Sequence, residues 1–68
     1  MNFGKRLKET RMQKKMTQQA LADKAKVELR TYQRYEQGVR EPSFATLLAL
    51  ADALEVSTDY LLGHNENT

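Results

Sequence analysis

Apolar positions recur along the chain with the 3.6-residue period of amphipathic helices. From Phe3 onward, the apolar residues Phe3, Leu7 and Met12 fall near one face, while lysines occupy other positions. This pattern predicts a first helix of about three turns. Glycine and proline are scarce, and β-branched residues are few and scattered, so the sequence gives little support for strands. We therefore predict an all-α protein.

A second helix is predicted to begin at Thr17, whose hydroxyl can accept hydrogen bonds from the exposed amides of the next turn. Met16 before this cap and Leu21 after it have the spacing of a hydrophobic staple. The segment TQQALADKA extends the helix to about Ala25. Its inner side is expected to carry Ala20, Leu21 and Ala25.

The helical pattern restarts in ELRTYQRYEQG and ends at Gly38, a suitable C-terminal glycine. Only about three residues connect this third helix to the second, and two short helices joined so tightly must cross steeply. The pattern therefore predicts a helix-turn-helix over approximately residues 17–37.

Two further helices are predicted after the break at Pro42, with Ser43 and Ser57 as their N-caps. The last helix, TDYLL, closes at Gly63, and residues 64–68 are expected to be a frayed polar tail. We thus predict one compact five-helix domain over residues 1–63. The fourth helix is the most apolar and is expected to form the centre of the core through Phe44, Leu47, Leu48, Leu50, Ala51 and Leu54.

Charge divides the chain sharply, although the net charge is only +2. Residues 1–40 hold all eleven Lys and Arg against four acids, giving +7, whereas residues 41–68 hold five acids and no Lys or Arg. Such polarity favours binding of a polyanion through the basic part. The alternative is that lopsided charge only keeps a small protein soluble.

Composition argues against several other classes of protein. The chain has no cysteine, which fits a reducing compartment, and no apolar run long enough to span a bilayer. No signal-peptide pattern is present at the N-terminus, so a cytoplasmic protein is expected. His64, the sole histidine, lies in the polar tail without a nearby partner. With no metal-ligand cluster, phosphate loop or nucleophile–base pair, we expect neither an enzyme nor a bound metal or cofactor.

The predicted third helix has two different faces. Tyr32, Tyr35 and Glu36 share one side, where the tyrosines are interpreted as core residues with their hydroxyls at the surface. The other side is a continuous polar stripe at helical spacing, formed by Arg30, Gln33, Arg34 and Gln37. A solvated face explains such a stripe equally well. However, arginine matches the O6 and N7 acceptors of guanine, and glutamine can pair with adenine.

Three segments in order resemble the lambda-repressor/Cro-like (XRE-type) helix-turn-helix domains. They are TQQALADKA, TYQRYEQG and REPSFATLLALADALEVSTDYLLG, and the resemblance covers approximately residues 3–63. It implies a five-helix domain that binds duplex DNA through its third helix, usually as a homodimer on a palindromic site. It also implies an ion pair between Arg11 and Glu36 that ties the first and third helices together.

The resemblance assigns base contacts to the third helix, at Leu29, Arg30, Gln33 and Arg34. Leu29 stays open, because it could either contact a thymine methyl or join the core. Gln18 at the start of the second helix is a further candidate base contact. It is also expected to support both a phosphate and a base-contacting residue, and the free amides of its helix end suit phosphate. The candidate phosphate contacts are Thr17, Gln18, Arg40, Arg6 and Lys15.

The sequence departs from the family where glycine often follows a helix, since Lys15, Lys26 and Glu55 stand there. If the backbone at these residues is left-handed, each carries a steric cost of roughly 1 kcal/mol. Glu28 also replaces the usual Ser or Thr cap, although a carboxylate can still accept from exposed amides.

The sequence therefore predicts a sequence-specific regulator of transcription that binds double-stranded DNA and acts as a repressor, with no small-molecule effector evident. One short helix contacts only a few base pairs, so we expect a homodimer on two half-sites. The residues expected to pair the copies are Tyr60, Leu61 and Leu62. The alternative is a protein-interaction module of the antitoxin type with the same fold.

Overall fold

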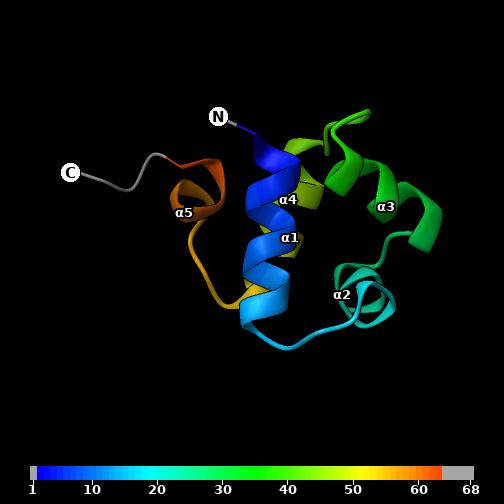
Figure 1. Cartoon of the computed structure of the whole chain (residues 1–68), viewed down its shortest axis with the longest axis horizontal. Coiled ribbons are helices and arrows are strands. Elements are labelled where there is room, and N and C mark those ends of the chain that lie inside the picture. The colour runs from blue at the N-terminus through cyan, green and yellow to red at the C-terminus, as the bar shows by residue number, and fades with distance from the viewer. Residues whose placement is uncertain (1, 64–68) are drawn as a thin grey trace.

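The computed structural model describes residues 2–63, which are all-helical (Figure 1). All five predicted helices are confirmed. The predicted tail, residues 64–68 with His64, lies outside the described residues. The helices are α1 (Phe3–Gln13), α2 (Gln18–Ala25), α3 (Leu29–Gln37), α4 (Phe44–Leu54) and α5 (Thr58–Leu62).

Side-chain caps fix the starts of four helices. Thr17, Ser43 and Ser57 each accept a hydrogen bond from the amide three residues on, at 3.0, 3.2 and 3.0 Å, as predicted. Asn2 caps α1 in the same way, at 3.1 Å, which the hydrophobic pattern did not indicate. Glu28 precedes α3 but its side chain makes no cap hydrogen bond, so the expected carboxylate cap is absent.

The helices surround one core, to which every helix contributes (Figure 1). α1 contacts α3 and α5, α2 contacts α3 and α4, and α4 contacts α5. In Figure 1, α5 lies on one side of α1 and the α2–α3 pair lies on the other. The buried apolar side chains are Leu7, Leu21, Ala22, Ala25, Tyr32, Tyr35, Leu50, Ala51, Leu54 and Leu61.

Four residues predicted to face the core are exposed. On α4, Phe44 is 73% exposed and Leu48 43% exposed. Phe44 lies in the first turn, and Leu48 is turned roughly 120° around the helix from the buried Leu54. Met12 on α1 is 58% exposed, and Ala20 on α2 is also exposed. The apolar pattern of α4 is therefore wider than the face that the other helices cover.

Left-handed backbone occurs at the three residues that stand in place of glycine. Lys15, Lys26 and Glu55 have φ angles of 59°, 61° and 60°. Lys26 and Glu55 end α2 and α4, so these helices stop with the backbone that glycine would otherwise supply. Each of the three residues carries the steric cost of a Cβ in left-handed backbone, as expected from the family resemblance.

Gly4 permits the close approach of α1 to α3. A Cβ built on Gly4 would lie 2.5 Å from the backbone oxygens of both Tyr35 and Glu36. Any larger residue must push the two helices apart, so glycine fixes their spacing.

None of the helices within residues 2–63 is long and apolar enough to cross a membrane.

Candidate nucleic-acid interface

The inner face of α3 is anchored by its two tyrosines. Tyr32 is fully buried and Tyr35 is 4% exposed, and their rings meet edge to face with centroids 6.4 Å apart. The expected core position of both rings is confirmed. The hydroxyl of Tyr32 does not reach the surface, however, because it donates a hydrogen bond to the carboxylate of Glu36.

The same carboxylate forms the predicted ion pair with α1. Arg11 Nε lies 2.7 Å from Glu36 Oε2, and Arg11 Nη2 donates to Glu36 Oε1 at 3.4 Å. Only 12% of the arginine side chain and 5% of the glutamate side chain are exposed. Arg11 Nη1 also donates to the carbonyl oxygen of Met16 at 2.8 Å. One guanidinium thus ties α1 to α3 and to the segment that enters α2.

Glu36 stays ionised despite its burial. Burial by itself raises the pKa of Glu36, but hydrogen bonds from Arg11, Tyr32 and Gln18, together with the charge of Arg11, bring the pKa below its ordinary value. The Glu36 hydrogen bond raises the pKa of Arg11, and burial together with the Glu36 contact raises the pKa of Tyr32. The site therefore holds a guanidinium, a carboxylate and a neutral phenol.

A chain of amides runs from this carboxylate toward the outer face of α3. Gln18 Nε2, at the start of α2, donates to Glu36 Oε1 at 3.0 Å. Gln33 Nε2 donates in turn to Gln18 Oε1 at 3.2 Å. The family resemblance implied that Gln18 supports a residue of the third helix, and the structure identifies that residue as Gln33.

The outer face of α3 is polar and accessible. Arg30, Arg34 and Gln37 are exposed, whereas Gln33 and Leu29 are half-buried. The partly buried apolar side chains that pack on the core lie elsewhere, at Phe3, Met16, Val27, Leu47, Ala49, Ala53 and Val56. The arrangement favours the interpretation of Leu29 as a surface residue over that of a core residue.

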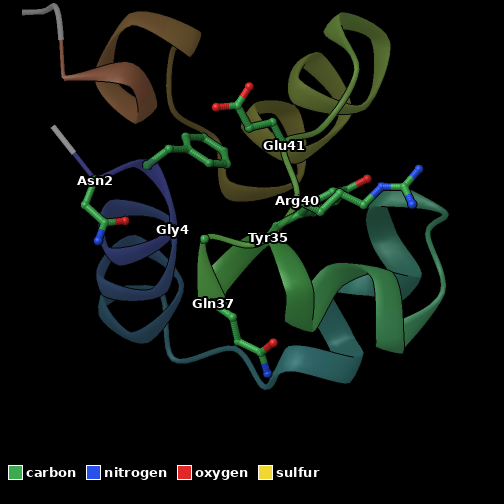
Figure 2. A pocket seen from close by; sticks show the side chains of 8 residues that line it. Asn2, Gly4, Tyr35, Gln37, Arg40 and Glu41 are labelled. Atoms are coloured by element: carbon green, nitrogen blue, oxygen red, sulfur yellow. The ribbon is translucent and has the colours of Figure 1, made fainter.

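Three of the candidate phosphate contacts are exposed near the ends of α2 and α3. Lys15 and Thr17 precede α2, and Arg40 follows α3. Arg40 borders a polar pocket of about 390 Å³ between the start of α1 and the end of α3, shown in Figure 2. In that view the Arg40 side chain extends away from α1.

The structure gives Arg6 a different environment. Its Nε donates to the backbone oxygen of Tyr60 at 2.8 Å, and its guanidinium lies 4.5 Å from the centre of the Tyr60 ring. These contacts join α1 to α5, on the side of α1 that faces away from α2 and α3 (Figure 1). Arg6 is therefore placed to hold α5 rather than to project toward a phosphate beside α2 and α3.

The predicted pairing surface also needs a correction. Leu61 is fully buried in the core, because it faces inward from the short α5, and its side chain cannot contact a second molecule. Tyr60 and Leu62 are half-buried. Of the three residues expected to pair two copies, only these two retain exposed surface.

Together, α2 and α3 form a tight helix pair whose second member is fixed on one face and polar on the other. This arrangement defines a helix-turn-helix protein. The chain belongs to the helix-turn-helix family, whose model matches residues 7–61.

Curated relatives are regulators of transcription. The chain is 46% identical to the uncharacterized HTH-type transcriptional regulator YqaE of Bacillus subtilis, over 96% of this chain and 56% of that protein. It is 44% identical to the regulator ImmR of the same organism, over 97% and 52% of the two chains. It is also 38% identical to the phage CTXphi transcriptional repressor RstR of Vibrio cholerae, over 93% and 56%. The chain thus spans about half the length of these relatives.

A solved structure shares the fold. The restriction-modification controller protein C.AhdI from Aeromonas hydrophila superposes with a TM-score of 0.86 at 33% identity. The match covers 88% of this chain and 91% of that chain.

Proposed function

We propose that the chain is a sequence-specific duplex-DNA-binding unit that regulates transcription, acting as a repressor, with α3 in the major groove. The observation that carries this proposal is the division of α3. Its inner face is fixed by Tyr32 and Glu36, while Arg30 and Arg34 project from the exposed face. Support also comes from RstR, a relative that is named as a transcriptional repressor.

The chemistry of the exposed face suits base edges. A guanidinium donates two parallel hydrogen bonds to guanine O6 and N7, so Arg30 and Arg34 favour guanine. Leu29 offers an apolar contact for a thymine methyl. Around this face, Lys15, Thr17, Gln18 and Arg40 are proposed to contact phosphates, with the helix end after Thr17 adding backbone donors.

We further propose that two copies bind a palindromic site. Recognition of a few base pairs by one helix gives little specificity, and two-fold pairing places two recognition helices about 34 Å apart. Tyr60 and Leu62 on α5 are the proposed contacts. Because the ligand is genomic DNA, the proposed place of action in a bacterium is the cytoplasm.

Selection of bound sequences from random duplex DNA tests the proposal. We expect enrichment of a sequence with two-fold symmetry, whose half-sites are centred about 10 base pairs apart or a multiple of that spacing. Recovery of no enriched sequence at low salt contradicts it and favours the alternative of a protein-interaction module.

Sedimentation on and off the selected DNA tests the pairing. We expect two copies per DNA duplex for the wild type and loss of pairing for Leu62→Asp. Leu48→Asp, which also places a charge at a partly exposed leucine, is the control and should still pair. A Leu62→Asp variant that folds and binds as a dimer contradicts the assignment of α5.

A further inference from the structure

The direction of each hydrogen bond in the Glu36–Gln18–Gln33 chain is set by the charge of Glu36. An ionised carboxylate only accepts hydrogen bonds, whereas a glutamine amide has one accepting and one donating end. Gln18 must therefore present its NH₂ group to Glu36, as it does at 3.0 Å. Its oxygen is then turned toward α3, where it accepts from Gln33 at 3.2 Å.

This arrangement leaves Gln33 with a defined pair of groups for a ligand. One N–H of its NH₂ group is used by Gln18. The second N–H and the carbonyl oxygen remain, one donor beside one acceptor. Adenine offers the complement in the major groove, an N6 donor beside the N7 acceptor, whereas guanine offers two acceptors, O6 and N7.

We propose that Glu36, acting through Gln18, fixes the amide of Gln33 so that Gln33 binds adenine and discriminates against guanine. This inference rests on the proposed function, since it concerns how the same face of α3 selects a base. Gln33 is the residue that touches the base, and with respect to that base Gln18 and Glu36 are positioning residues.

The opposite orientation of the Gln18 amide is disfavoured by the carboxylate of Glu36. If Gln18 were rotated, its oxygen would face the carboxylate of Glu36, and two acceptors would be held together without a proton. Glu36 cannot easily take up a proton, because Arg11 and Tyr32 donate to the same carboxylate. Rotation of Gln33 alone would likewise place two amide oxygens against each other.

The test measures the preference between adenine and guanine at one base pair. Sites selected by the wild type provide the duplex, and Gln33→Ala identifies the position where the preference disappears. Competition binding with adenine or guanine at that position then gives the ratio of the two affinities. For the wild type we expect adenine to be favoured by about tenfold or more.

Gln18→Lys provides the sharpest variant. An ammonium group only donates, so it can still bind Glu36 but must face Gln33 with donors. Gln33 is then expected to accept with its oxygen and present its NH₂ group to the groove. The adenine-to-guanine ratio should fall by about tenfold or more, toward guanine. Gln18→Met, which has no hydrogen-bonding amide, should give a ratio between those of the wild type and Gln18→Lys.

Gln19→Lys is the matched control, because it adds the same charge at the neighbouring position. The amide of Gln19 bonds to Asp23 at 2.8 Å and lies outside the chain from Glu36 to Gln33. The adenine-to-guanine affinity ratio of Gln19→Lys should equal that of the wild type. Thermal melting of each variant establishes that it is folded, and Gln18→Met keeps the Arg11–Glu36 pair if Gln18→Lys does not fold.

Two results overturn the inference while leaving the proposed function intact. One is enrichment of a specific site at which Gln33→Ala changes no position, or at which the Gln33 position favours guanine. The other is a ratio that stays within about twofold of the wild type in folded Gln18 variants. If the wild type enriches no site at all, the proposed function itself is contradicted, and this inference with it.

Discussion

Arg11 Nε on α1 lies 2.7 Å from Glu36 Oε2 in the last turn of α3, with both side chains almost completely buried. The pair fixes the helix that carries the exposed Arg30 and Arg34 without touching the exposed face. Glu36 also accepts from Tyr32 and Gln18, so one carboxylate organises contacts from α1, α2 and α3. The orientation of α3 thus depends on residues that would not contact a ligand.

Arg11→Ala should strongly destabilise the fold. The substitution leaves Glu36 as a buried charge without its cation, which costs about 3–5 kcal/mol in comparable pairs. It also removes the donor to the Met16 carbonyl. Urea denaturation measures the free energy of unfolding. Lys8→Ala, at an exposed position of the same helix, is the control and should change that energy by less than about 0.5 kcal/mol. A similar small effect of Arg11→Ala would show that the pair contributes little.

Stability should fall in acid because of Glu36. The pKa of this carboxyl is lowered in the folded state from an ordinary value of 4.5, so the folded protein binds its proton less readily than the unfolded chain. The contribution of Glu36 is therefore full above the ordinary pKa and is lost as pH falls through the folded pKa. Urea midpoints from neutral pH to about pH 2 should show the gap between wild type and Glu36→Gln closing. A gap that is constant with pH would refute this role.

Gly4→Ala should destabilise the protein although it lies in a helix. Alanine gains about 1 kcal/mol over glycine in helix propensity. Overpacking against the backbone oxygens of Tyr35 and Glu36, only 2.5 Å from the new Cβ, should cost more than this gain, about 1–3 kcal/mol or above. Thermal unfolding is the measurement. Gly38→Ala is a useful comparison, because its Cβ meets nothing within 4 Å and the strain of its φ of +79° alone should cost about 1 kcal/mol. A higher Tm for Gly4→Ala would contradict the close contact.

Glu55→Gly should stabilise the protein. Glu55 ends α4 with a φ of 60°, and removal of its Cβ relieves a left-handed strain of about 1 kcal/mol. The same substitution at the exposed Asp52, inside α4, should instead cost a few tenths of a kcal/mol, roughly 0.3, because glycine ranks only slightly below aspartate in helix propensity. Denaturation of the two variants side by side gives opposite signs on this account. Equal destabilisation by both would show that position 55 carries no strain.

The sequence was sufficient to predict the helices, because caps and periodicity are local properties. Thr17, Ser43 and Ser57 each cap a helix where the pattern placed them. The three left-handed residues were anticipated only through the resemblance, because they stand where the family often has glycine. The ion pair between Arg11 and Glu36 followed from the resemblance, because it depends on two identifiable residues.

The remaining features depend on how the helices pack, which local pattern does not specify. The need for Gly4 arises only where α1 crosses α3. The exposure of Phe44 and the burial of Leu61 reflect which faces of α4 and α5 other helices cover. The link from Gln33 to Gln18 joins two elements, and only their three-dimensional arrangement brings the two amides together.

The proposal that α3 binds DNA through its arginines can be tested by one measurement, the affinity of wild type, Arg30→Ala and Arg34→Ala for the selected duplex and for duplexes with single base-pair changes, at low salt. We expect each alanine variant to melt like the wild type, to bind more weakly by about 1–3 kcal/mol and to lose preference at its own base position. Lys24→Ala, at an exposed position of α2 on the side next to Ala53 of α4, should bind as the wild type does. If the folded wild type binds no duplex DNA even at low salt, or if both arginine variants bind with unchanged affinity and specificity, the account of α3 as the DNA-contacting helix is wrong.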